Sequence, residues 1–358
     1  PPFYFYPTPP PPPILSGLVG SEMCIRDRLY VLRTRADNML RQAHNGRIQM
    51  TTDLQKRIYQ AQCIGNVEPI EYMIPYPNTH ALIEGQNIKF AEQVIYEQGD
   101  ITNRILYELI QKTAHWLDSI NIKPRERVIT HDLGFPQTEI LLFGIWHLGA
   151  SAVILESLDI NNAKQSCSTE HLIEPDTDLL KAIEPFPTDF DPKYKALLGD
   201  EALVSCSRER GIRLSHYNLL AKTNSVQKAI DIKSRTRIFC DLQPDSTSWV
   251  VLKAILPIYC GCIFTDKKAD ITISDKDQNS TFYMRKDLKN LAQFKDNHLA
   301  ICPENTAVLS RGTSPIHLTD LTLEENTLAI RGHSVMMGYL NDTKNESSFS
   351  NKTLYIPI

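Results

Sequence analysis

The sequence TEILLFGIWHLGASAVILE, residues 138–156, indicates how this chain folds. Its first half is almost entirely apolar and follows Phe135-Pro136, which predicts a buried helix that Gly149 ends. From Ala150 to Glu156 the apolar run continues nearly unbroken, as expected for a strand buried on both faces of a parallel sheet. A helix that leads directly into such a strand is typical of α/β proteins.

The residues before this stretch also alternate between an expected helix and expected strands. Residues 103–120 place their apolar side chains on one face, and Thr102 or Asn103 is a suitable N-cap, so we expect a helix. That face consists of Ile105, Leu106, Leu109, Ile110, Ala114, Leu117 and Ile120. Residues 127–130 and 90–96 are expected to form strands.

The following residues extend the pattern. Residues 202–264 predict a strand, a turn, a helix over 219–230, a strand over 236–241, a helix over 249–259 and a last strand. Residues 300–358 are richer in Thr, Ser and short apolar alternations, which indicates a β-rich end. We therefore predict an α/β fold of layered sheets and helices.

Composition narrows the possible functions. The formal net charge is -4 without a basic excess, which argues against a nucleic-acid partner. No apolar run approaches the length of a membrane-spanning helix. Eight cysteines without a framework spacing are expected to be reduced thiols in a cytoplasmic protein, and we expect no metal site.

The first 49 residues differ in sequence character from the rest of the chain. Pro1–Pro13 is a Pro/aromatic low-complexity run, and the string from Ser16 to Arg28 resembles translated sequencing-adapter read-through. A signal peptide is the competing interpretation, but no basic residue precedes the short apolar stretch. Residues 1–49 are therefore expected to be an artefactual or disordered leader, and Met50 to be the authentic start.

Three groups of segments resemble the acyl-adenylate-forming (AMP-binding) ligases. Residues 101–128 and 141–153 resemble two scaffold segments of these enzymes. Residues 201–204 and 211–220, the latter GIRLSHYNLL, resemble the two flanks of their phosphate loop. The most specific match is residues 326–342, NTLAIRGHSVMMGYLND, which is similar to the family's segment around Arg-Gly-x-x-Val-Met-x-Gly-Tyr. The resemblance implies the large N-terminal lobe of such a ligase.

The phosphate loop itself departs from the family pattern. The family has a Gly-rich loop ending in lysine, whereas only Ser205–Arg210 joins the flanks here, without a glycine. Backbone N–H groups approach phosphates closely where side chains are absent. Glu209 adds a charge that repels phosphate, and Arg210 takes the place of the lysine. Ser207, Arg208, Arg210 and Gly211 are therefore predicted to be the remnant of the loop, and no catalytic residue is assigned.

Other elements implied by the resemblance are also missing. No Pro-x-x-His string follows the loop, and no aromatic-Gly-x-Thr-Glu string, the family's magnesium and adenine motif, occurs after residue 220. The Thr-Gly-Asp expected after Phe349 and the small C-terminal domain are absent as well. The expected divisions are a first α/β subdomain over 50–195, a second over 196–275 and a shortened β-rich end over 276–358.

These observations lead to three hypotheses for the function. The first is a ligase-like pseudoenzyme without adenylation activity, kept for binding a partner or a small carboxylic acid or acyl ligand, or else decaying. The second is an active acyl-CoA or aryl-acid ligase, for which the resemblance implies ATP and Mg²⁺ as cofactors. The third is a non-catalytic interaction protein. An intact loop in the resequenced locus would favour the second, and a reproducibly co-purifying partner would favour the third.

Overall fold

The stretch that leads the sequence analysis forms a helix and a strand, as predicted. Helix α5 (Gln137–Leu148) is followed by strand β4 (Ser151–Leu155), and all of the helix except Gln137 is buried. Gly149 ends the helix with a φ of 87°, a conformation that side chains disfavour. A Cβ atom at this position would also lie 2.9 Å from the Tyr194 carbonyl oxygen, so only glycine fits here.

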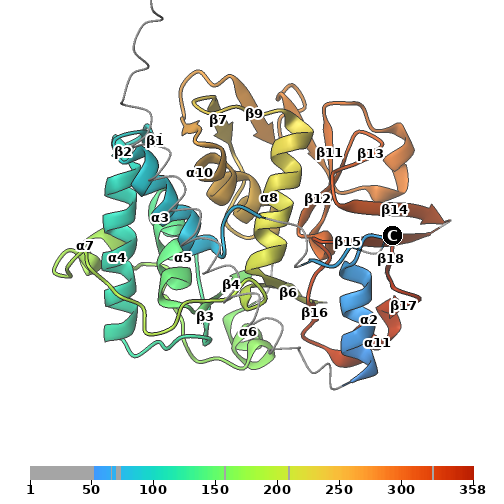
Figure 1. The fold of residues 1–358 in the computed structure, drawn as a ribbon, viewed down its shortest axis with the longest axis horizontal. Coiled ribbons are helices and arrows are strands. Elements are labelled where there is room, and N and C mark those ends of the chain that lie inside the picture. Colours follow the sequence, from blue (N-terminus) through green and yellow to red (C-terminus); the bar gives the residue numbers. More distant parts are fainter. Residues whose placement is uncertain (1–51, 66, 70–73, 157–158, 209, 325) are drawn as a thin grey trace, which may run out of the picture. The chain divides into compact units, whose positions relative to one another are not determined.

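This computed structural model describes residues 52–65, 67–69, 74–156, 159–208, 210–324 and 326–358 (Figure 1). The expectations for residues 1–49 and for Met50 lie outside these ranges, and so does Glu209. In this part of the chain, no helix is both long and apolar enough to cross a membrane.

Strand β4 belongs to a five-stranded sheet with the order β16-β6-β5-β4-β3. Strands β3, β4 and β5 are parallel, whereas β5 and β6 form an antiparallel hairpin, and β16 pairs with β6. The other strands are β3 (Arg127–Ile129), β5 (Glu201–Cys206), β6 (Gly211–Ser215) and β16 (Gly338–Tyr339).

A nine-stranded sheet has the order β13-β12-β11-β10-β9-β7-β8-β1-β2. Strands β1 and β2 come early in the chain but lie beside strands that come much later. Tyr96 of β1 pairs in parallel with Phe264 of β8. The strands are β1 (Val94–Tyr96), β2 (Ile101–Thr102), β7 (Arg237–Cys240), β8 (Ile263–Phe264), β9 (Ile271–Ser274), β10 (Phe282–Arg285), β11 (His298–Cys302), β12 (Ala307–Arg311) and β13 (Ser314–Pro315).

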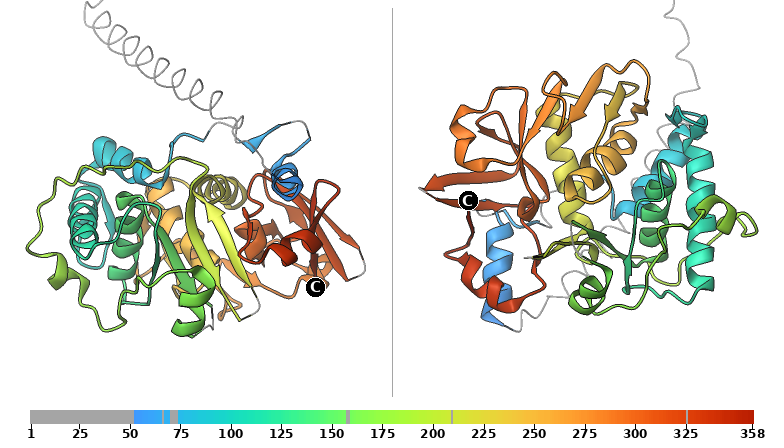
Figure 2. Two further views of the ribbon diagram at one scale, coloured as in Figure 1. Left: turned by 90° about the horizontal axis from the view of Figure 1, so that it is seen from below. Right: turned by 180° about the vertical axis from the view of Figure 1, so that it is seen from behind.

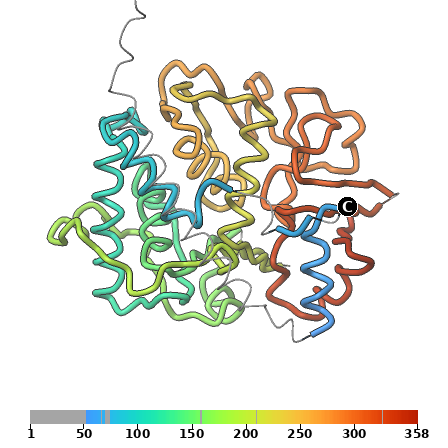
Figure 3. Tube along the Cα trace, viewed as in Figure 1, coloured from blue at the N-terminus to red at the C-terminus, as the bar shows by residue number. Residues whose placement is uncertain are grey.

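A four-stranded antiparallel sheet, with the order β14-β15-β18-β17, completes the predicted β-rich end. It contains β14 (Thr319–Glu324), β15 (Thr327–Gly332), β17 (Phe349–Ser350) and β18 (Thr353–Pro357). Helix α2 (Asp53–Gln62), blue in Figure 3, packs on this sheet beside the red C-terminal segments. Arg57 Nη1 donates a 2.8 Å hydrogen bond to the Phe349 carbonyl, and Gln62 Nε2 donates to the carbonyls of Val335 and Met336.

The remaining helices cover the sheets. Helices α3, α4 and α5 pack together on one side, as Figures 1 and 2 show. The helical segments are α3 (Thr79–Phe90), α4 (Asn103–Ser119), α6 (Ile160–Cys167), α7 (Leu179–Ile183), α8 (His216–Ile230), α9 (Thr247–Trp249), the π-helical turn η2 (Val250–Ile255), α10 (Leu256–Cys260), the 3₁₀ turns η3 (Leu288–Gln293) and η4 (Pro303–Asn305), and α11 (Asp342–Ser348).

Helix α3 was not predicted, and the strand expected over 90–96 is shortened to β1. The helix begins with Asn78, whose side chain accepts a hydrogen bond from the Ala81 N–H, so the sequence did contain an N-cap. Ile88 and Phe90 near its end are 75% and 50% exposed, whereas Thr79 and Gln86 are buried. The helix therefore lacks the apolar face from which a helix is recognised.

Glu201 holds four strands together at the start of β5. Its carboxylate accepts two hydrogen bonds from Arg127 of β3, at 2.7 and 2.8 Å, and one from Arg213 of β6 at 2.6 Å. Ser151 of β4 donates a further bond at 3.3 Å. Burial alone would raise the pKa of Glu201, but the two guanidinium groups hold that pKa below its usual value. Glu201 is therefore a charged group in a nearly buried position.

Helix α8 connects two sheets and carries a buried lysine. It packs on β5 and β6 in one sheet and on β12 in another. Ser215 and Asn218 form a capping box at its beginning. Lys222 is fully buried, and its Nζ donates a 2.5 Å hydrogen bond to the Val308 carbonyl. Burial lowers the pKa of Lys222 to about 7, since the charged form loses its hydration.

Replacing Glu201 with glutamine should destabilise the protein, because Arg127 and Arg213 would lose the charge that they share. We expect Glu201→Gln to lower the free energy of unfolding by about 3 kcal/mol in urea denaturation at pH 7. The control Glu108→Gln removes an exposed ion pair with Arg104 and should cost less than about 0.5 kcal/mol. Equal effects of the two variants would show that the Glu201 network contributes little.

Replacing Lys222 with methionine should change how stability depends on pH. The pKa of Lys222 falls from 10.5 to about 7 on folding, so between these pH values the unfolded chain binds the additional proton and stability rises with pH. Lys222→Met should abolish this rise and increase the free energy of unfolding by roughly 2–4 kcal/mol at pH 7. Urea denaturation from pH 6 to about pH 10 measures how the free energy of unfolding depends on pH. The exposed Lys228 of the same helix supplies the control Lys228→Met, and identical slopes in all three proteins would contradict the prediction.

Candidate functional site

The predicted phosphate-loop remnant is a tight turn. Strands β5 and β6 pair up to Cys206 and Gly211, the last partners of the hairpin. The Ser207 N–H then donates a 2.8 Å hydrogen bond to the Arg210 carbonyl, and the Ser207 hydroxyl reaches the same oxygen at 3.3 Å. A connection of this kind is a short β-hairpin turn. It is closed by the two hydrogen bonds between Ser207 and Arg210.

Gly211 is required by packing within the sheet. A Cβ atom at this position would lie 2.4 Å from the Leu340 side chain, closer than two carbon atoms can approach. The Leu340 N–H donates a 2.8 Å hydrogen bond to the Gly211 carbonyl, beside the pairing of Tyr339 with Ile212. The glycine thus allows the segment around β16 to pack onto the hairpin.

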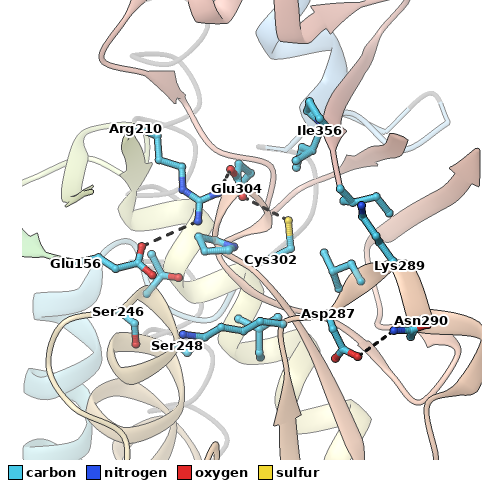
Figure 4. Close-up of a pocket in the computed structure, with 17 residues that line it drawn as sticks. Glu156, Arg210, Ser246, Ser248, Asp287, Lys289, Asn290, Cys302, Glu304 and Ile356 are labelled. Carbon is cyan, nitrogen blue, oxygen red and sulfur yellow. Dashed lines mark hydrogen bonds and ion pairs between the residues drawn. The ribbon is translucent and has the colours of Figure 1, made fainter. Parts of the chain in front are cut away.

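Arg210 points from the turn into a group of carboxylates, as Figure 4 shows. Its Nη1 lies 2.6 Å from Oε1 of Glu304, which is 2% exposed, and Nη2 lies 4.0 Å from Glu156 Oε2. Tyr339 donates a 3.2 Å hydrogen bond to the same Glu304 oxygen. Burial opposes the charge of Arg210, but the two carboxylates hold the pKa of this guanidinium above its usual value. The guanidinium is therefore neutralised within the protein.

A cavity of about 370 Å³ lies beside this group. Its lining includes one of the four predicted site residues, Arg210, whereas Arg208 lies exposed on the turn. The cavity lining contains three positively charged residues and three negatively charged residues. The positive residues are Arg210, Lys286 and Lys289, and the negative residues are Glu156, Asp287 and Glu304. The polar and apolar lining residues are Ser246, Thr247, Ser248, Asn290, Cys302, Leu288, Ile301, Pro303, Ile356, Pro357 and Ile358.

The two carboxylates beside Arg210 were missed by the sequence analysis, although the position of Glu156 carries a signal. Glu156 follows β4 directly, and α/β proteins bind ligands at the carboxyl ends of their parallel strands. Glu304 follows β11 of the other sheet after Pro303, and its approach to Arg210 has no local signal. The Glu156 N–H donates a 2.7 Å hydrogen bond to the Cys206 carbonyl, so the ends of β4 and β5 meet beside the turn.

Two groups that could meet a phosphate at this turn already have partners within the protein. The Ser207 N–H is bonded to Arg210, and the Arg210 side chain is bonded to Glu304. Two carboxylates face the space where additional negative charge would enter. Among the described residues, no three His, Cys, Asp or Glu side chains are grouped so that they could hold a metal ion.

Comparisons by sequence give no match, either to protein-family models or to curated proteins. Solved structures do match. The anthranilate CoA ligase AuaEII in complex with anthranoyl-AMP has a TM-score of 0.65 and 14% identity, over 81% of this chain and 75% of that one. The N-terminal domain of FACL13 from Mycobacterium tuberculosis has a TM-score of 0.61 and 12% identity, over 77% of this chain and 95% of that one.

A third similar structure is the unliganded O-succinylbenzoate coenzyme A synthetase (MenE) from Bacillus subtilis. It has a TM-score of 0.65 and 13% identity, over 78% of this chain and 75% of that one. At such identities a structural likeness establishes the fold and leaves the activity open. The chain therefore has the mixed α/β fold of the N-terminal lobe of AMP-binding acyl- and aryl-CoA ligases.

Proposed function

We propose that this protein is an acyl-adenylate-forming ligase-like protein without adenylation activity. The fold of its described part supports the relationship. One observation supports the lack of activity: the turn from Ser207 to Arg210 is closed by its own backbone hydrogen bond, and Arg210 is paired with the buried Glu304. In this segment the Ser207 N–H and the Arg210 guanidinium thus already have partners within the protein.

Electrostatics supports the same proposal. Adenylation concentrates negative charge on the transferred phosphate, and removing one donor that stabilises such charge typically costs 10²- to 10³-fold in rate. A triphosphate in this cavity would have to take Arg210 away from Glu304. The carboxylate of Glu304 would then remain buried without its cation, at a cost on the order of several kcal/mol.

A small carboxylic acid is the ligand that we assign to the cavity. Lys286 and Lys289 supply positive charge, and Ile301 and Ile356 supply apolar surface in the same lining. Among similar structures, AuaEII is in complex with anthranoyl-AMP, and VinN is in complex with L-aspartate. The seven cysteines that the structure describes are all free thiols, which supports the cytoplasmic location that we include in the proposal.

An active ligase is the alternative, and one observation favours it. Two carboxylates, Glu156 and Glu304, lie beside Arg210 in one cavity, and carboxylate oxygens are ligands that Mg²⁺ prefers. Their charge would suit a metal-bound nucleotide better than a free one.

Titration of the full chain with Mg-ATP distinguishes the two proposals. We expect no heat of binding up to about 1 mM ATP, the upper range of ordinary enzyme substrates, and no pyrophosphate exchange with a panel of carboxylic acids. Anthranilate, titrated alone, should bind, and Lys289→Ala should weaken its binding.

Micromolar ATP binding together with pyrophosphate exchange would overturn the proposal and establish the ligase. In that case Arg210→Ala should abolish the exchange. Arg208→Ala is the matched control, because Arg208 lies exposed on the same turn and does not line the cavity.

A further inference from the structure

Two cysteines meet beside the turn. Cys167 is the last residue of α6, and Cys206 is the last residue of β5. Their Sγ atoms lie 2.9 Å apart, although the residues are 39 positions apart in the chain. Both are buried, in a small apolar cluster formed with Ile129, Val153, Ala163 and Val204. This cluster is separate from the main core.

The distance between the sulfur atoms is close to that of a bond. A disulfide needs an S–S distance of about 2.05 Å, so the two atoms have to approach by roughly 0.9 Å. The thiols already share a hydrogen, which means that they face one another. Small movements of two side chains therefore suffice.

The surroundings of the two cysteines shift their pKa values in opposite directions. The hydrogen bond between the two thiols, together with the charge of Arg127, holds the pKa of the Cys167 thiol below its usual value. The Arg127 guanidinium lies close by, since its Nη1 donates a 3.0 Å hydrogen bond to the Cys167 carbonyl. Hydrogen bonding and burial raise the pKa of Cys206. We assign Cys167 as the nucleophile of the pair, because the Arg127 guanidinium is bonded to its carbonyl and the thiolate is the reactive form.

Helix α6 gives a small oxidant access to Cys167. The helix spans only Ile160–Cys167, and four of its residues are exposed: Asn161, Asn162, Gln165 and Ser166. Short helices with few buried side chains open locally at low cost in free energy. Such an opening uncovers the Cys167 thiol without unfolding the sheet.

We propose that Cys167 and Cys206 form a disulfide bond when the protein meets a peroxide. The Cys167 thiolate attacks one peroxide oxygen, the O–O bond breaks, and Cys167 becomes a sulfenic acid while the other oxygen leaves as water. The Cys206 sulfur then attacks the Cys167 sulfur, the S–O bond breaks, and a second water leaves. The two thiols lose two electrons and two protons, and the peroxide is reduced to two waters.

The bond would tie the end of α6 to the residue before Ser207. The turn and Arg210 would then be anchored to α6 by a covalent link, in addition to the hydrogen bonds of the sheet. The proposal does not depend on the absence of adenylation, because it rests on the two thiols alone.

Peptide mapping of the oxidised protein tests the proposal. The full chain is reduced with dithiothreitol, freed of the reductant, treated with hydrogen peroxide and alkylated in denaturant. Mass spectrometry should show that most molecules lose two hydrogens, and a digest without reductant should contain the Cys167 peptide joined to the Cys206 peptide. Dithiothreitol should reverse both changes.

Serine variants provide the controls. In Cys206→Ser the link should be absent, and Cys167 should accumulate added oxygen instead. Cys260→Ser removes a buried cysteine elsewhere and should leave the link unchanged. The proposal is overturned if Cys167 and Cys206 are both fully alkylated after peroxide treatment, or if either is joined mainly to another cysteine. Peptide mapping of the chain without substitutions tests the proposal even if a serine variant does not fold.

Discussion

The ion network around Glu201 is the constraint on which the five-stranded sheet depends. One carboxylate at the start of β5 binds Arg127 of β3 and Arg213 of β6, so it fixes strands on both sides of β5. A buried charge contributes to a unique arrangement only when its partners are in place, and here three of its hydrogen bonds come from guanidinium groups. With one end of β5 fixed in this way, its other end presents Cys206 and the turn at a defined place.

At that other end a second ion pair joins the sheets. Arg210 extends from the turn to Glu304, which follows β11 of the nine-stranded sheet, and Tyr339 of β16 binds the same carboxylate. The Arg210 side chain is thereby part of the framework that holds the two sheets together. A cation cannot neutralise a buried carboxylate and a phosphate to the same extent, so the structural use of Arg210 opposes its use for nucleotide binding.

Much of this fold was predictable from sequence where short-range patterns decide the structure. Helices α4 and α5 and strand β4 follow from runs of apolar residues with clear ends. The segment between β5 and β6 was predicted as a phosphate-loop remnant, and the hydrogen bond that closes it was not predicted. Helix α3 was missed because two of its apolar side chains are exposed. The pairing of β1 with β8 and the contact between Arg210 and Glu304 were out of reach, since each joins residues far apart in the chain without a local signal.

The position of helix α2 has a consequence for how the protein is made. Arg57 on this early helix finds its acceptor, the Phe349 carbonyl, 292 positions later in the chain. At about 5–20 residues per second, a ribosome needs roughly 15–60 s to add that length. During this time the side of α2 that packs on the last sheet, with the donor groups of Arg57 and Gln62, has no site on which to dock. While these residues are being added, α2 exposes the side that later packs on the last sheet, and chaperones can bind there.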